Sequence, residues 1–114
     1  MPGERPQRSD GQAPDGVGSA GPASRAARSV VVTGRVQGVS FRWSLRKVAE
    51  RHGVLGWVAN RDDGAVEAHL EGDPDAVETV EAWVHAGGPP SAEVADVEVR
   101  AVDPTGLDRF EIRR

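Results

Sequence analysis

A glycine-containing segment directly before a predicted helix holds the residues best suited to bind an anion. Residues 34–42 read GRVQGVSFR, with Gly38 in the loop and Arg42 in the first helical turn. Glycine permits backbone angles at which successive N–H groups face one concave surface, and the unpaired N–H groups of a helix start add to it. The guanidinium of Arg42 matches phosphate in charge and geometry. The segment predicts a site for a phosphate-sized anion; the alternative is a structural turn with a solvated Arg42.

Asn60 is the second residue whose position suggests chemistry. It ends a predicted strand, just before a turn at Arg61–Gly64. Its carboxamide can accept from water and donate to it, and it carries no charge that would repel a phosphate. The alternative is an ordinary turn residue, and these residues alone favour that interpretation.

Other chemistries find little support in the sequence. The chain has no cysteine, which excludes disulfides, thiolate zinc sites and a cysteine nucleophile. His52, His69 and His85 lack metal-ligand spacing and are interpreted as surface or packing residues. Ser40 and Ser44 lack a nucleophile-elbow motif, and neither a Walker nor a GxGxxG pattern occurs. We expect no metal and no cofactor.

Composition narrows the function classes further. The 114 residues are 38% apolar, and the net charge is −4. No apolar run approaches the ~18 residues of a membrane span. The acidic balance disfavours a nucleic-acid surface. Residues 1–28 lack the apolar stretch of a secretory signal, so we expect that they are not an export sequence. We therefore expect a protein that binds neither membrane nor nucleic acid. We further expect a cytoplasmic protein and a monomer.

Two regions of different composition divide the chain at about residue 28. Residues 1–28 contain 17 Gly, Pro, Ser or Ala, so they are predicted to form a disordered leader. Residues 29–114 carry ten Arg or Lys and 15 Asp or Glu, and all the chemistry is expected there.

Alternating strand and helix patterns must position the candidate residues. Hydrophobic spacing predicts strands at 29–33, 54–60, 65–70, 93–102 and 108–113, and helices at about 41–52 and from 74 onward. Asp73 and Pro74 form a typical helix start. This order predicts an α+β fold, the ferredoxin-like α/β sandwich, with two helices packed on one face of a mainly antiparallel sheet of four to five strands.

The predicted fold also suggests where the tryptophans and the acidic residues lie. Trp57 and Trp83 are predicted to lie in the core, whereas Trp43 lies off the apolar stripe of the first helix and is expected to border the cleft. The acidic residues are interpreted as a solvated face; they are Glu67, Glu71, Asp73, Asp75, Glu78 and Glu81.

Beyond these generic features, residues 29–114 resemble acylphosphatases. GRVQGVSFR at 34–42 and GWVAN at 56–60 are the most specific segments. The others are DGAVE at 63–67, LEG at 70–72, GGPPSA at 87–92, PTG at 104–106 and FEIR at 110–113.

The resemblance implies metal-independent hydrolysis of the carboxyl–phosphate bond of small acyl phosphates, with inorganic phosphate as product and competitive inhibitor. It implies that Arg42 holds the phosphoryl group and that Asn60 positions water. It also implies a phosphate cradle formed by the backbone of Val36, Gln37, Gly38, Val39, Ser40, Phe41 and Arg42.

Two other function classes fit the same element order. One is a non-catalytic anion-binding or regulatory module that keeps the loop without turnover, although the presence of Asn60 counts against it. The other is an RNA-binding domain, but such folds stack bases on strand aromatics, and the strand at 65–70 has none.

Overall fold

A computed structural model describes residues 25–114, and Arg25 directly precedes the first strand. The strands are β2 (Ala26–Arg35), β3 (Leu55–Asn60), β4 (Val66–Gly72), β5 (Glu93–Ala101) and β6 (Phe110–Arg113). The helices are α2 (Phe41–Arg51) and α3 (Pro74–His85). No helix in this part of the chain is long and apolar enough to cross a membrane.

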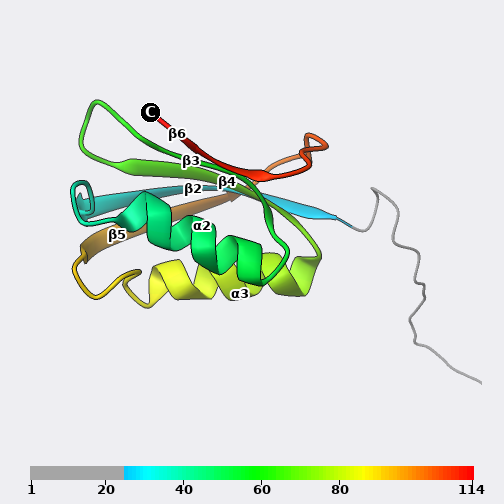
Figure 1. The fold of residues 1–114 in the computed structure, drawn as a ribbon, viewed down its shortest axis with the longest axis horizontal. Helices are drawn as coiled ribbons and strands as arrows, with labels where there is room; N and C mark the ends of the chain where they lie inside the picture. Colours follow the sequence, from blue (N-terminus) through cyan, green and yellow to red (C-terminus); the bar gives the residue numbers. More distant parts are fainter. Residues whose placement is uncertain (1–24) are drawn as a thin grey trace, which may run out of the picture.

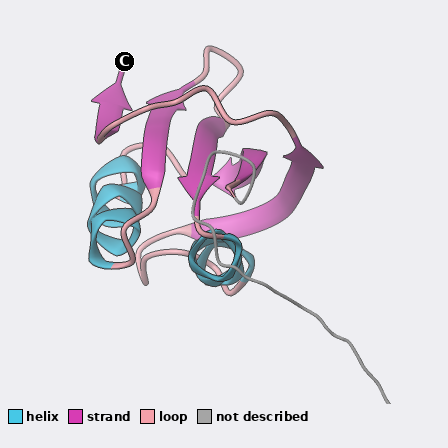
Figure 2. Ribbon diagram, turned by 90° about the vertical axis from the view of Figure 1, so that its right-hand side faces the viewer, coloured by secondary structure: helices cyan, strands magenta, loops and turns pink. Residues whose placement is uncertain are grey.

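The five strands form one sheet in the order β5-β2-β4-β3-β6, and both helices cover the same face of it (Figures 1 and 2). All neighbouring strands are antiparallel except β3 and β6, which run parallel. This is the expected ferredoxin-like α+β fold, with a fifth strand at one edge. Within residues 25–114, the other face of the sheet carries no helix (Figure 2).

The core lies between the sheet and the two helices. Alternate residues of β2 and β4, such as Val30, Val32 and Leu70, point toward the helices and are almost fully buried. They meet Leu45 of α2 and Val80 of α3. The spacing of two along strands and of three to four along helices produces these facing apolar surfaces.

The helix starts differ in how the chain forms them. At α3 the Asp73 side chain accepts a hydrogen bond of 2.9 Å from the N–H of Asp75, and Pro74 stands in the first turn, as predicted. At α2 the N-cap residue is Ser40, which has φ 63° and makes no side-chain cap. The N-terminal N–H groups of α2 are thus not capped by that side chain.

The first strand is longer than predicted. β2 starts at Ala26, so residues 26–28 of the expected leader belong to the sheet, where they pair with Gly72, Glu71 and Leu70. Small residues such as Ala26 and Ala27 give little strand signal, and partners on β4 and β5 override their weak preference. The rest of the predicted disordered leader, residues 1–24, lies outside the described residues.

Two side-chain predictions are wrong. Trp57 is not in the core: it lies on the face without helices, with its ring against His69 at a centroid distance of 6.4 Å and the Arg113 guanidinium 4.9 Å from its centroid. Glu71 is not solvated, because its exposure is 0%. Trp83, by contrast, packs against the core as predicted.

Candidate active site

The loop between β2 and α2, which is the expected anion cradle, contains two residues in the left-handed backbone conformation. Gly38 has φ 75° and Ser40 has φ 63°, and Ser40 is the sole non-glycine residue with positive φ among residues 25–114. Left-handed residues next to right-handed ones turn successive N–H groups toward one concave side. A non-glycine residue in this region carries strain of roughly 1–3 kcal/mol, and such strain gathers at functional sites. The cradle leads directly into the N-terminus of α2.

Side chains fix this loop to its neighbours on two sides. Nε2 of Gln37 donates to the main-chain oxygens of Arg61 and Ala65 at 2.8 and 2.9 Å. Oγ of Ser91 donates to the Val39 oxygen at 2.8 Å. The cradle is therefore tied both to the β3–β4 turn and to the segment between α3 and β5, which lie at the same end of the molecule (Figure 1).

Arg42, in the first turn of α2, is oriented by the far end of the chain. Its Nη1 donates to the main-chain oxygen of Arg113 at 2.8 Å. A guanidinium has five N–H donors, so this contact leaves others for a ligand. Because the side chain is half-buried, it loses less entropy on binding than a free surface arginine would.

A cleft of about 160 Å³ joins the predicted residues. It is lined by Val36, Gly38, Ser40, Phe41, Arg42, Trp43, Asn60 and Ile112. Asn60 enters it from the last position of β3, on the helix-facing side, like Val58 two residues earlier. The fold thus brings Arg42 and Asn60, 18 positions apart in the sequence, to one cavity beside the cradle.

Not all predicted loop residues line this cleft. Gln37 and Val39 are absent from its wall, and both instead make the tethers of the loop. Trp43 does border the cleft and is 53% exposed. Ile112 was missed as a wall residue, although its predicted strand position on the same face as Phe110 was the available signal. Ser44 is not on the wall.

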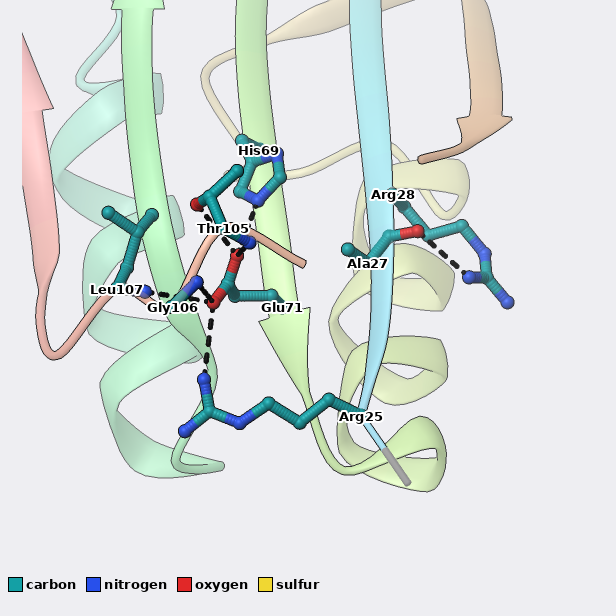
Figure 3. A network of polar contacts seen from close by, with 8 residues as sticks. All are labelled: Arg25, Ala27, Arg28, His69, Glu71, Thr105, Gly106 and Leu107. Carbon is teal, nitrogen blue, oxygen red and sulfur yellow. Dashed lines mark hydrogen bonds and ion pairs between the residues drawn. The ribbon is translucent and has the colours of Figure 1, made fainter. Parts of the chain in front are cut away.

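The opposite end of the sheet contains a buried carboxylate that sequence reasoning missed. Oε1 of Glu71 accepts hydrogen bonds from the N–H and hydroxyl of Thr105, at 2.8 and 3.1 Å, and lies 2.7 Å from Nε2 of His69. Oε2 accepts from the N–H groups of Gly106 and Leu107, both at 3.0 Å, and from Arg25 at 3.2 Å (Figure 3). These bonds hold the segment that leads into β6.

The same contacts determine the protonation of Glu71. Burial raises its pKa, but hydrogen bonds from Thr105, His69 and Leu107 outweigh burial and lower the pKa from 4.5 to about 2. The carboxylate is therefore charged at neutral pH. The alternation of Glu67, His69 and Glu71 places all three on one face of β4, but it does not signal a partner in the PTG segment.

Residues 25–114 contain no group of three or more His, Cys, Asp or Glu placed to hold a metal ion. Arg42 is the charged side chain among the residues that line the cleft.

Comparison with known proteins identifies the family. The acylphosphatase family model matches residues 28–112. An acylphosphatase of Anaeromyxobacter dehalogenans is 53% identical over 92 residues, which cover 80% of this chain and 98% of the relative. One of Thermococcus kodakarensis is 52% identical over 81 residues, 71% of this chain and 88% of the relative.

The fold agrees with this match. The crystal structure of acylphosphatase from Bacillus subtilis aligns with a TM-score of 0.74 and 37% identity, over 78% of this chain and 99% of that one. The chain thus belongs to the acylphosphatase family, whose members are hydrolases.

Proposed function

We propose that the protein hydrolyses the carboxyl–phosphate bond of small acyl phosphates at the cleft beside α2, releasing a carboxylate and inorganic phosphate. The observation that carries this proposal is the meeting of the strained cradle, Arg42 and Asn60 in one cavity. An acyl phosphate needs little chemical activation because its carboxylate is already a good leaving group. Positioning and charge stabilisation are therefore the main tasks of the protein.

The phosphoryl group binds in the cradle in this mechanism. N–H groups of the loop and of the first turn of α2 donate to its oxygens, and the guanidinium of Arg42 balances the negative charge. The contact between Arg42 and the Arg113 oxygen supports this role because it holds the guanidinium at the cleft before substrate arrives. Less ordering is then required during the reaction.

Asn60 positions the attacking water. Its carboxamide oxygen accepts a hydrogen bond from the water, which directs the water oxygen at phosphorus. As the new P–O bond forms, the bond between phosphorus and the acyl oxygen breaks and the carboxylate leaves with the electron pair. A phosphate oxygen of the substrate accepts the proton from water, so no protein base is required.

The reaction proceeds without a metal ion or cofactor in this proposal. Positive charge for the phosphoryl group comes from the N-terminus of α2, the N–H groups of the cradle and Arg42. These groups take the place of the metal ion that assists many phosphate-binding loops. We also propose that the protein acts as a cytoplasmic monomer, which mass measurement in solution and fractionation of cells would test.

A single assay tests the proposed function. Hydrolysis of benzoyl phosphate is followed in a chelating buffer, with inorganic phosphate as competitor. We expect turnover that persists in chelator and competitive inhibition by phosphate. Phosphate binding without turnover would instead favour the alternative, a non-catalytic anion-binding or regulatory module. A requirement for added Mg²⁺ or Zn²⁺ would overturn the mechanism.

A further inference from the structure

A second hollow lies along α2 beside the cleft, and we call it the α2 groove. Its volume is about 230 Å³. Trp43, Lys47 and Arg51 of α2 form one side, and Trp83, Pro89 and Pro90 form the other. Trp43 borders both the cleft and the groove, so the two hollows share one wall. An acyl group attached to a phosphate in the cleft would reach the groove across the Trp43 side chain.

Behind the groove, its lining residues Trp83 and Gly88 pack against the buried ring of Phe41. The Phe41 ring lies 5.7 Å from that of Trp83, between centroids. A Cβ built on Gly88, at φ 67°, would lie 2.5 Å from Cε2 of Phe41, so the backbone there packs directly on the ring. For scale, a cavity of about 150 Å³ accommodates benzene. The groove has room for a group of that size, although it is open on one side.

The rim of the groove is positively charged. Lys47 holds its ammonium 4.6 Å from the centroid of the Trp43 ring. Arg51 follows one helical turn further on. Helix α2 has four basic residues, Arg42, Arg46, Lys47 and Arg51, and one acidic residue, Glu50, whereas residues 29–114 as a whole are acidic. The cations are thus concentrated on the helix that starts at the cradle.

The apolar lining and the basic rim of the α2 groove together suit one class of acyl group. We propose that the α2 groove binds the acyl part of the substrate and favours acyl groups with an apolar or aromatic body and a second, distal anionic group. The body lies on Trp43, and the distal anion faces Lys47, about 7 Å further along the helix axis than Arg42. This inference rests on the proposed function, because it requires the phosphoryl group in the cleft.

The test compares two substrates that differ only in the distal charge, benzoyl phosphate and 4-carboxybenzoyl phosphate. Wild type is compared with Lys47→Met, which keeps a long side chain without the charge, and with Lys47→Arg, which keeps the charge. Arg109→Gln is the matched control, since Arg109 is a 71% exposed cation on the β6 side, outside the groove.

We expect Lys47→Met to lower kcat/KM for the carboxylated substrate by roughly three- to tenfold more than for benzoyl phosphate at low ionic strength. Lys47→Arg should restore the difference, and Arg109→Gln should leave it unchanged. Using the ratio of substrates cancels their different intrinsic reactivities. Added salt should reduce the preference of wild type.

The experiment distinguishes failure of the groove proposal from failure of the proposed function. If wild type hydrolyses both substrates and Lys47→Met changes them equally, the groove proposal is wrong and the proposed function stands. The same conclusion follows if Arg109→Gln has the effect of Lys47→Met. If wild type hydrolyses neither substrate, the proposed function fails, and the assignment of the groove to the acyl group fails with it.

Discussion

Nη1 of Arg42 lies 2.8 Å from the main-chain oxygen of Arg113 and donates a hydrogen bond to it, which ties the first turn of α2 to β6. One donor of the guanidinium is thereby used for orientation, which leaves its other N–H donors for a ligand. Side chains of this length are costly to order, so a fixed anchor makes the charge more effective. The proposed phosphate-binding role of Arg42 follows from this arrangement.

Replacing this cation should weaken both binding and catalysis. In Arg42→Gln, the inhibition constant of inorganic phosphate should rise at least tenfold and kcat/KM should fall on the order of 10³-fold, because the phosphoryl group is negative in ground and transition states. Steady-state kinetics with phosphate as inhibitor measures both. Arg109→Gln, with the same loss of charge, should match wild type. Unchanged phosphate inhibition in Arg42→Gln would exclude the role.

The proposed role of Asn60 predicts a different pattern. Asn60→Ala should lower kcat on the order of 10²-fold and leave phosphate affinity nearly intact, since a preorganised group for water is lost but no charge. Asn60→Asp should additionally weaken phosphate binding by repulsion. The same kinetic measurements test both variants. Near-normal kcat in Asn60→Ala would show that water positioning lies elsewhere.

Gln37 should act through the position of the cradle. Gln37→Met removes the two hydrogen bonds to the Arg61 and Ala65 oxygens, so the loop and Asn60 lose their fixed spacing. We expect kcat to fall by about tenfold, with a smaller change in phosphate inhibition. Thr79→Val, which removes a side-chain bond to the Asp75 oxygen in α3, is the control. An equal loss in Thr79→Val would indicate general loosening.

Stability should depend on the ionisation of Glu71. Its pKa is about 2 in the folded protein against 4.5 ordinarily, so its contribution is complete above pH 4.5 and is lost as pH falls toward 2. That contribution is on the order of 3 kcal/mol. Denaturant unfolding at pH 7 and pH 3 should show about 2 kcal/mol of this loss in wild type, because pH 3 still lies above the folded-state pKa, and much less in Glu71→Gln.

Glu67→Gln, on the same strand and face, is the control for this measurement. It should keep the pH dependence of wild type. His69 and Arg25 face Glu71 and remain in both variants. An unchanged pH profile in Glu71→Gln would show that other groups cause the acid sensitivity.

The length of the first strand sets the boundary for truncation. A chain starting at Arg25 should keep the activity and melting temperature of the full chain, because it retains all pairs of β2. A chain starting at Ser29 loses the pairs at 26–28, the contact of Arg25 with Glu71 and the Val102 N–H bond to the Ala27 oxygen. Thermal unfolding should detect a loss of about 2 kcal/mol, or roughly 10 °C. Equal melting temperatures would contradict this.

Local signals explain which parts of the fold were predictable. The Asp73–Pro74 start and the β3–β4 turn at residues 61–65 each depend on nearby residues, and they appear where expected. The seven predicted elements occur in the predicted order. The start of β2 at Ala26 was not predictable from nearby residues, because alanine has little strand preference of its own and these positions are held by pairing with β4.

The features that the sequence did not predict depend on contacts between segments that are distant in the chain. The burial of Glu71 depends on residues 105–107, and a glutamate on a strand gives no sign of such a partner by itself. The left-handed Ser40 is similar, since serine does not favour that conformation and the surrounding tethers must hold it. Arg42 and Asn60 were proposed from their motifs, and the structure places both at one cleft; the wall formed by Ile112 depends on the parallel pairing of β3 and β6.

That parallel pairing has a consequence for biosynthesis. Ile112 lines the cleft and the Arg113 oxygen anchors Arg42, so both depend on a strand that starts 50 positions after the end of β3. A nascent chain whose residues 110–113 are still inside the ribosome can pair β2, β3 and β4, yet it lacks one wall and the arginine anchor. Hydrolytic competence should consequently appear only after β6 has emerged and docked beside β3.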